Sequence, residues 1–249
     1  MAWPCTFSRS SPMTSRRLGA GGKPLLDVMR LSQTPYADTY RLQQELLEKR
    51  IAGEIPDTLI LTEHDPIVTV GRGAGPKDVS NVEVPVVEIE RGGEATYHGP
   101  GQVVAYPIYE LPEDAHDVHR YMRNLEEVVI RVLAEVDVVG IRRAGLTGVW
   151  IGEQKVASIG VAVRRWVTWH GFALNVHTDL APFSQFQPCG LDPKVMTRVA
   201  DCAEIPPASI LFEVLIVKHF LEIFDLELPA QAAPAAPETG FPDLPILPS

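Results

Sequence analysis

A cysteine lies between a proline and a glycine at Pro188-Cys189-Gly190. Proline and glycine favour turns, and because turns tend to be exposed, we expect the thiol to be accessible. A thiol becomes a nucleophile when a nearby cation or base favours the thiolate. Cysteine-based acyl transfer is the chemistry that this arrangement predicts. The side chains that qualify as the base, among which residue type alone does not choose, are His98, His170, His177 and Lys155.

Lys155 opens the second strand of a predicted hairpin. The apolar segments 148–152 and 155–163 flank a tight turn. A lysine at the end of a strand usually reaches water, and its position favours that interpretation. Burial would instead favour the neutral amine, which can act as a base. The residues that strict alternation places on the face of Lys155 are Ala157, Ile159 and Val161.

Small side chains recur on two neighbouring predicted strands. The small-faced positions are Val156, Ser158 and Gly160 on the first strand, and Gly171, Ala173 and Asn175 on the next. Two adjacent small faces leave room for a long apolar ligand. A helix packed closely over both strands is the alternative explanation.

A glycine-rich segment, RGGEATYHGPGQ, extends from Arg91 to Gln102. Glycines let the backbone approach a ligand closely, and Arg91, Tyr97 and His98 would supply polar contacts. A structural role for His98 is the alternative. We interpret the segment as the second wall of the pocket that contains the cysteine.

A second glycine-rich stretch, GRGAG at 71–75, is similar to a phosphate-binding loop. It lacks the G-x-G-x-x-G spacing, and no helix is expected directly after it. A glycine-rich turn is therefore favoured over a nucleotide site. Elsewhere, Cys202 is predicted to be a small buried hydrophobic residue.

The pattern of apolar residues predicts a single α/β (α+β) domain over residues 25–228. Consecutive strands leave no room for crossover helices, so we expect a mixed, largely antiparallel sheet flanked by helices. A cap at Thr34 is expected to start the first helix, which continues to Gly53. Further helices are expected at 117–139 and 208–226. The predicted strands are 25–31, 57–64, 67–71, 84–90, 103–111, 148–152 and 155–163.

Composition excludes several classes of function. The net charge of −10 opposes binding to nucleic acid, and no apolar run is long enough to span a membrane. Three cysteines without paired spacing favour a reducing compartment. Because the chain is acidic, it would bind an acidic partner only through a local basic patch. The alternative is that its arginines form a solvated face. The candidate arginines for such a patch are Arg142, Arg143, Arg164 and Arg165.

Both ends of the chain have compositions typical of disorder. Residues 1–24 form a basic leader rich in Ser, Arg, Gly and Pro, and residues 229–249 are rich in Pro and Ala. The leader has no apolar run of the kind found in a secretory signal, although its composition leaves an organellar transit peptide open. We predict a cytoplasmic location.

Five blocks of the sequence resemble the lipoyl(octanoyl) transferases, the octanoyl-[acyl-carrier-protein]:protein N-octanoyltransferases of lipoate biosynthesis. The blocks occur in order within residues 25–228 and read TEHDPIVTVGRGA, RGGEATYHGPGQVVAYPI, GLTGVWIGEQKVASIGV, WHGFALNV and QPCGL. The resemblance implies the catalytic fold shared with biotin and lipoate protein ligases. It also implies octanoyl transfer through an octanoyl-cysteine thioester.

The resemblance assigns roles to individual residues. It implies a catalytic dyad of Cys189 and Lys155, with Lys155 or His98 as the base for the attacking amine. The family usually has a Val-Thr-Ser-Leu-like run after the cysteine, whereas this chain retains Thr197 but has Arg198 at the serine position. The residues that the resemblance places in the acyl pocket are Arg91, Gly92, Gly93, Glu94, Ala95, Thr96, Tyr97, His98, Ser158, Ile159, Gly160, Gly171, Phe172 and Ala173.

The partners implied by the resemblance are two classes of protein. Acyl carrier protein would donate octanoyl from its phosphopantetheine, and lipoyl domains of 2-oxoacid dehydrogenase complexes and the glycine cleavage H protein would accept it. No metal, ATP or other cofactor is expected, because a thioester is already activated. The alternatives are an ATP-dependent lipoate or biotin protein ligase and a non-catalytic module that binds acyl groups or carrier proteins.

Overall fold

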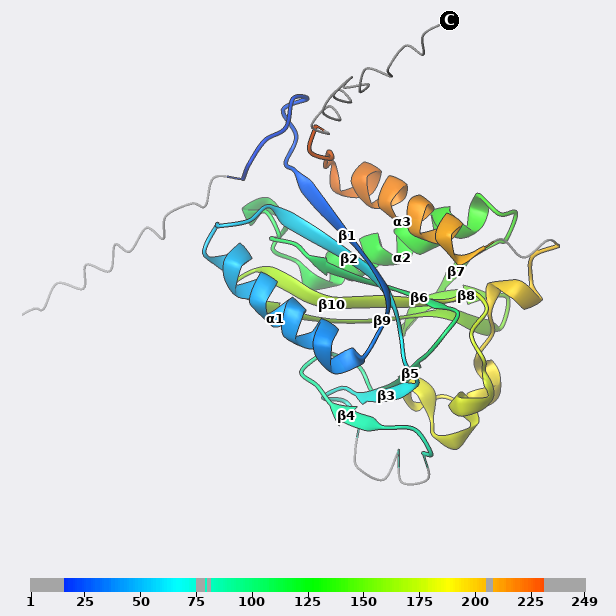
Figure 1. Cartoon of the computed structure of the whole chain (residues 1–249). Coiled ribbons are helices and arrows are strands. Elements are labelled where there is room, and N and C mark those ends of the chain that lie inside the picture. Colours follow the sequence, from blue (N-terminus) through cyan, green and yellow to red (C-terminus); the bar gives the residue numbers. More distant parts are fainter. Residues whose placement is uncertain (1–15, 75–78, 80–81, 205–207, 231–249) are drawn as a thin grey trace, which may run out of the picture.

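The computed structural model describes residues 16–74, 79, 82–204 and 208–230. Its main element is a seven-stranded sheet (Figure 1). Only β1 and β2 run parallel, while every other neighbouring pair is antiparallel. The mixed, largely antiparallel α/β fold is therefore confirmed. In spatial order the strands are β1 (Leu26–Thr34), β2 (Asp57–His64), β6 (Gln102–Ile108), β10 (Val167–Asn175), β9 (Gln154–Arg164), β8 (Leu146–Ile151) and β7 (Ile141–Arg143).

A second, three-stranded sheet lies at one end of the first (Figure 1). Its strands, in the order β4-β3-β5, are β4 (Val86–Glu88), β3 (Ile67–Val70) and β5 (Ala95–His98). The sequence predicts β3 and β4 as strands but does not show that they leave the main sheet. This small sheet holds the glycine-rich segment against the end of the main sheet.

Helices cover both faces of the main sheet (Figure 1). The helices α2 (Val118–Ala134) and α3 (Ser209–Phe224) pack on one face, and α1 (Tyr36–Ile51) packs on the other. Alternation along β2 sends Leu59 to the α2–α3 side and Ile60 to the α1 side. Each fully buried residue of this kind contributes about 1.5–3 kcal/mol to folding.

The helix boundaries differ from the prediction most clearly at the start of α1 and at the end of α2. Pro35, not Thr34, directly precedes α1, and Thr34 is still the last residue of β1. Asp117 caps α2 by accepting from the backbone N–H groups of the first turn, at 2.9 and 3.1 Å. This helix ends at Ala134 rather than at residue 139, because Asp137 adopts a left-handed φ of 57° that cannot continue it.

The sequence predicts a disordered leader over residues 1–24, but residues 16–24 have a defined structure. The prediction was wrong for this part of the leader. Leu18 pairs with Pro24, and Arg16 lies 3.3 Å from the buried carboxylate of Asp57. Leu25 then pairs with Glu227 beyond α3. Composition did not predict this order, because the contacts join residues far apart in the sequence. The rest of the leader (1–15) and the tail from residue 231 lie outside the described residues.

Candidate active site

A cavity lies between the α1 face of the main sheet and the small sheet. It is bounded by parts of α1, β5, β6, β9 and β10 and by the glycine-rich segment before β5. The residues that line it are Tyr36, Ile89, Arg91, Gly93, Glu94, Thr96, His98, Val104, Tyr106, Ser158, Ile159, Gly160, His170, Gly171, Phe172 and Ala173.

The structure brings together most of the residues that the sequence assigns to the acyl pocket, on β9, β10 and the glycine-rich segment. Three of them lie elsewhere. Ala95 and Tyr97 belong to a separate core with Phe183, because alternate residues of β5 point away from the cavity. Gly92 lines a groove on the outer side of the segment. The cavity also includes Tyr36 and Tyr106, which the sequence analysis did not single out.

Other residues of the protein occupy part of the space beside the small side chains of β9 and β10. A Cβ at Gly160 would lie 3.0 Å from Cδ of Arg91, so this glycine makes room for the arginine side chain. A Cβ at Gly171 would lie 2.1 Å from the carbonyl oxygen of Ala105 on the neighbouring strand. These two glycines therefore serve close packing, and they do not by themselves create space for a ligand.

Arg91 fastens the glycine-rich segment to the small sheet. Its Nη2 donates to the carbonyl and hydroxyl oxygens of Thr69, at 2.8 and 3.0 Å. Its Nη1 donates to the carbonyl of Gly92 at 3.1 Å. The side chain is 7% exposed and lines the cavity, so it places a positive charge on the cavity wall.

The 71–74 loop supports the glycine-rich segment with its own backbone. The N–H groups of Gly71, Arg72 and Gly73 donate to the carbonyls of Glu94, Arg91 and Gly93 at 3.0–3.2 Å. A phosphate cradle needs free N–H groups, and these are engaged within the protein. The structure therefore agrees with the predicted glycine-rich turn.

Three buried polar atoms on the cavity wall have no hydrogen-bond partner within the described residues. They are the hydroxyls of Tyr36 and Thr96 and Nε2 of His170. Buried polar atoms are almost always paired in folded proteins. An occupant of the cavity would therefore present polar atoms or ordered water at these points, in addition to an apolar chain.

The histidines on and beside the cavity wall are electrically neutral. Burial lowers the pKa of His98 and of His170 to about 3, and that of His64 to about 4. His64 also contacts the hydroxyl of Tyr106 through Nε2 at 2.8 Å. The exposed His177 does not line the cavity.

A directed chain of hydrogen bonds starts at His98. Gln102 Nε2 donates to the carbonyl of Tyr97 at 3.1 Å and to Asn175 Oδ1 at 2.9 Å. Its Oε1 is therefore the acceptor for His98 Nδ1, at 2.7 Å, so the proton of this neutral ring is on Nδ1. Nε2 of His98 is consequently a hydrogen-bond acceptor.

The same chain reaches the backbone of Lys155. Asn175 Nδ2 donates to the carbonyl of Thr197 at 3.0 Å, and the N–H of Thr197 donates to the carbonyl of Lys155 at 3.0 Å. These bonds connect the glycine-rich segment, two central strands and residues 196–197. No local sequence pattern connects these residues, because the two amide side chains are 73 positions apart.

Lys155 is buried, at 2% exposed, rather than in water at a strand end. A β-bulge causes the difference, because Trp150 pairs with Lys155 while Val149 pairs with Ala157. Val156 and Ala157 consequently both enter the α2–α3 core. The alternation shifts by one residue, so Lys155 faces the same way as the cavity-lining residues Ser158 and Gly160, and the predicted face for Lys155 was wrong.

Trp150 and Gly148 define the position of the Lys155 side chain. Its Nζ lies 5.9 Å from the ring centre of Trp150, a distance at which a cation is attracted to the aromatic face. A Cβ at Gly148 would lie 2.6 Å from Lys155 Cε, so the glycine provides the space for the lysine side chain. Gly148 in the preceding strand is thus the signal that sequence reasoning missed.

Cys189 lies in a 3₁₀ turn, Pro188–Gly190, that packs against β5. The position of its thiol is outside the described part of the structure. Gly190 has a φ of 68°, which favours glycine, and it lies beside Glu94. The other cysteine of this region, Cys202, is exposed, which contradicts the prediction of a buried side chain.

Arg198, at the position where the resemblance expects serine, folds back on its own loop. It donates to Asp201 at 3.0 Å and to the carbonyl of Thr178 at 3.1 Å. The arginine therefore fastens the segment after the cysteine. It does not line the cavity.

The four arginines proposed as a basic patch do not form one. Arg143 pairs with Glu153 at the β8–β9 turn, whereas Arg164 pairs with Glu48 of α1 at the other end of β9. Arg142 is held by Glu126 and Glu127. Three of the four arginines are thus engaged in ion pairs at separate places, which fits the alternative of a solvated face.

The described residues contain no group of three or more His, Cys, Asp or Glu side chains arranged to hold a metal ion. Among the helices that the structure describes, none has the length and apolar character needed to cross a membrane.

Comparison with known proteins identifies the family. Residues 35–220 match the family described as "Lipoyl protein ligase A/B catalytic domain". The chain belongs to this family. Among proteins of known structure, a lipoate-protein ligase A bound with ATP shares the fold of this catalytic domain, with a TM-score of 0.68 at 16% identity over 82% of this chain and 87% of the other.

Curated relatives are more similar in sequence. A protein of Syntrophotalea carbinolica named "Octanoyltransferase" is 43% identical over 84% of this chain and 99% of its own length. One of Rubrobacter xylanophilus with the same name is 47% identical over 80% of this chain and 93% of its own length. The match to the family covers the cavity, Lys155 and the Cys189 turn, because all of these lie within residues 35–220.

Proposed function

We propose that this chain transfers an octanoyl group from the phosphopantetheine thioester of acyl carrier protein to the ε-amine of a lysine on lipoyl domains. The name shared by its curated relatives supports the reaction type. The acceptors are the lipoyl domains of 2-oxoacid dehydrogenase complexes and the glycine cleavage H protein. The composition and the three cysteines without paired spacing support a cytoplasmic site for the reaction.

The buried position of Lys155 is the structural observation that carries this proposal. The side chain is 2% exposed, and it faces the side of the sheet that forms the cavity. Its backbone is joined to Thr197, only eight positions beyond Cys189 in the sequence. A nearby lysine amine is the type of group that activates a cysteine thiol.

In the first step Lys155 takes the proton of Cys189, and the thiolate attacks the octanoyl carbonyl. A bond forms between Sγ and the carbonyl carbon, and the bond from that carbon to the pantetheine sulfur breaks. The departing sulfur takes the proton from Lys155. Octanoyl-Cys189 and the free carrier thiol result.

In the second step the neutral amine of the acceptor lysine attacks octanoyl-Cys189. A carbon–nitrogen bond forms and the bond from carbon to Sγ breaks, while one amine proton passes through Lys155 to the sulfur. His98 is a poor candidate for this proton transfer, because its pKa of about 3 is far below the pH at which the base must act. We therefore assign the proton transfer of this step to Lys155.

The cavity would hold the acyl chain. Its apolar lining includes Ile89, Val104 and Phe172, and the polar atoms of Tyr36, Thr96 and His170 add hydrogen-bonding groups. Such a mixture is typical of small-molecule sites, where a few polar groups orient a mostly apolar ligand.

The intact mass of the protein after incubation with octanoyl-carrier protein, in the absence of ATP, tests the proposal. We expect one octanoyl group on Cys189, which an added lipoyl domain removes. Cys189→Ala should gain no such mass while remaining folded. Product formation only with octanoate and ATP would favour a ligase, and binding without any turnover would favour a non-catalytic module.

A further inference from the structure

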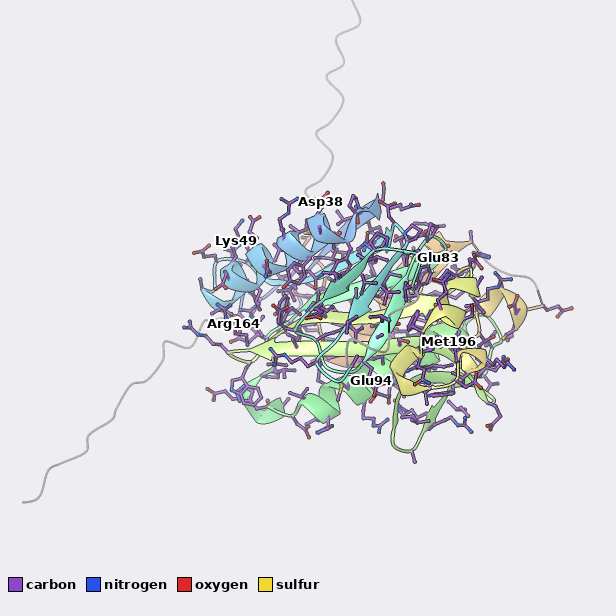
Figure 2. The ribbon with its side chains drawn as sticks, turned by 90° about the horizontal axis from the view of Figure 1, so that it is seen from below. Asp38, Lys49, Glu83, Glu94, Arg164 and Met196 are labelled. Atoms are coloured by element: carbon purple, nitrogen blue, oxygen red, sulfur yellow. The ribbon has the colours of Figure 1, made fainter. Side chains whose placement is uncertain are left out.

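The side chain of Glu94 lies at the edge of the cavity, between Gly73 and Gly190 of two other segments. A Cβ at Gly73 would be 3.3 Å from Glu94 Cγ, and a Cβ at Gly190 would be 2.3 Å from Glu94 Oε2. The side chain therefore passes Gly73 and brings its carboxylate against the turn that contains Cys189. In Figure 2, Glu94 lies beside the segment that carries Met196, on the same side of the molecule.

Two features of the structure favour glycine at position 190. Its φ of 68° favours glycine, and any side chain would meet the Glu94 carboxylate. The turn and the carboxylate thus fit each other closely. A group bound by Glu94 would lie next to the backbone of the residue that follows the nucleophile.

The carboxylate is not used elsewhere in the fold. Glu94 is half-buried and lines the cavity. Within the described part of the chain, no hydrogen bond or ion pair engages its side-chain oxygens, whereas its backbone carbonyl accepts from Gly71 at 3.2 Å. The backbone bond fixes the residue and leaves the carboxylate available to a substrate group.

We propose that the carboxylate of Glu94 binds the ε-ammonium group of the acceptor lysine and positions it beside the acyl-cysteine, where the group releases one proton through the carboxylate to water before the neutral amine attacks. This inference rests on the proposed function, in which a lysine of a lipoyl domain attacks octanoyl-Cys189. The acceptor arrives as a cation, and a carboxylate beside the thioester attracts it through a charge-assisted hydrogen bond. Because the acyl donor carries no such cation on its acyl group, Glu94 acts in the second half of the reaction.

The test measures the discharge of octanoyl-enzyme formed from wild type, Glu94→Gln and Glu94→Lys. Each acyl-enzyme is mixed with a lipoyl domain at a series of concentrations, and loss of the octanoyl mass is followed with time. Hydroxylamine, which is largely uncharged at neutral pH, serves as a second nucleophile that needs no ammonium site. Glu113→Gln is the matched control, since Glu113 is exposed on a turn beyond the far end of β6.

The expected result for Glu94→Gln is a rise of about tenfold in the lipoyl-domain concentration giving half-maximal discharge, with hydroxylamine discharge changed less than about twofold. Glu94→Lys should show a larger loss, and Glu113→Gln none. Equal slowing with both nucleophiles would overturn the inference, because it would show a distorted turn. An unchanged lipoyl-domain dependence would also overturn it. Failure of the wild type to form an acyl-enzyme would instead refute the proposed function.

Discussion

The side chain of Gln102 donates to Asn175 Oδ1 at 2.9 Å, and this bond links two residues that face each other on the paired strands β6 and β10. Asn175 passes the connection to the carbonyl of Thr197. Both amides are almost fully buried, at 1% and 2% exposed. Loss of one partner would leave a buried polar atom without a hydrogen bond.

Asn175→Asp should therefore destabilise the protein. The substitution replaces the Nδ2 donor with an oxygen opposite the Thr197 carbonyl, which is itself an acceptor. We expect a loss of about 1–3 kcal/mol in the free energy of unfolding, measured by urea denaturation at pH 7. Asn124→Asp in α2, where the side chain is only half-buried, is the matched control. Equal stability of the two variants would contradict the directed chain of hydrogen bonds.

Lys155→Met should abolish the reactivity of Cys189. Methionine has a similar length and no charge, so it fits the buried site without leaving a large cavity. We expect alkylation of Cys189 by iodoacetamide at neutral pH, and acyl transfer, to fall by about a hundredfold or more. Peptide mapping separates Cys189 from Cys202. Alkylation of Cys189 at the wild-type rate would exclude Lys155 as its activator.

Gly148→Ala should displace Lys155. The new Cβ would lie 2.6 Å from Lys155 Cε and 2.5 Å from the carbonyl oxygen of Ala157. We expect loss of acyl-enzyme formation with reduced stability. Gly145→Ala supplies the control, because Gly145 also has a positive φ but has open space around it. The control should lose only about 1–2 kcal/mol from backbone strain, and comparable acylation in the two variants would argue against a fitted place for the lysine.

Stability should decrease in mild acid. His64, His98 and His170 have folded-state pKa values of about 3 to 4, below the usual 6.5, because burial favours the neutral ring. Their contribution is complete above pH 6.5, where neither state is protonated, and it is lost as the pH falls toward 4 because the unfolded chain binds the protons first. Each histidine should remove about 1.4 kcal/mol per pH unit within that window. Urea denaturation at several pH values checks this, and a free energy that is flat from pH 7 to 5 would contradict it.

His170→Gln offers a direct test of this assignment. Removing one of the three histidines should reduce the slope of unfolding free energy against pH by about a third. The measurement compares slopes, so a constant loss of stability from the substitution does not affect it. An unchanged slope would show that His170 does not contribute.

Much of the fold could be predicted from local patterns. The apolar run bounded by turn residues predicted β2 at 57–64, as observed. The apolar stripe of α2 also proved to be its buried face, with Leu125 and Val129 in the core. These features depend on periodicity, which a short window of sequence contains.

The site depends on features that periodicity does not contain. The bulge at Val156 reverses the face of Lys155, and an alternating pattern cannot reveal an extra residue. The glycine at position 160 indicates space, but only the folded chain shows that Arg91 fills it. In both cases the deciding contact joins segments that are distant in the sequence.

The pairing of Leu25 with Glu227 brings the first strand and the last described residues together at one edge of the sheet. In Figure 1 this edge lies at the opposite end of the molecule from β3, β4 and β5. A reporter protein or surface tether joined near either point would therefore extend away from the small sheet and the cavity beside it. The enzyme can accordingly be immobilised through this edge with its substrates still free to approach.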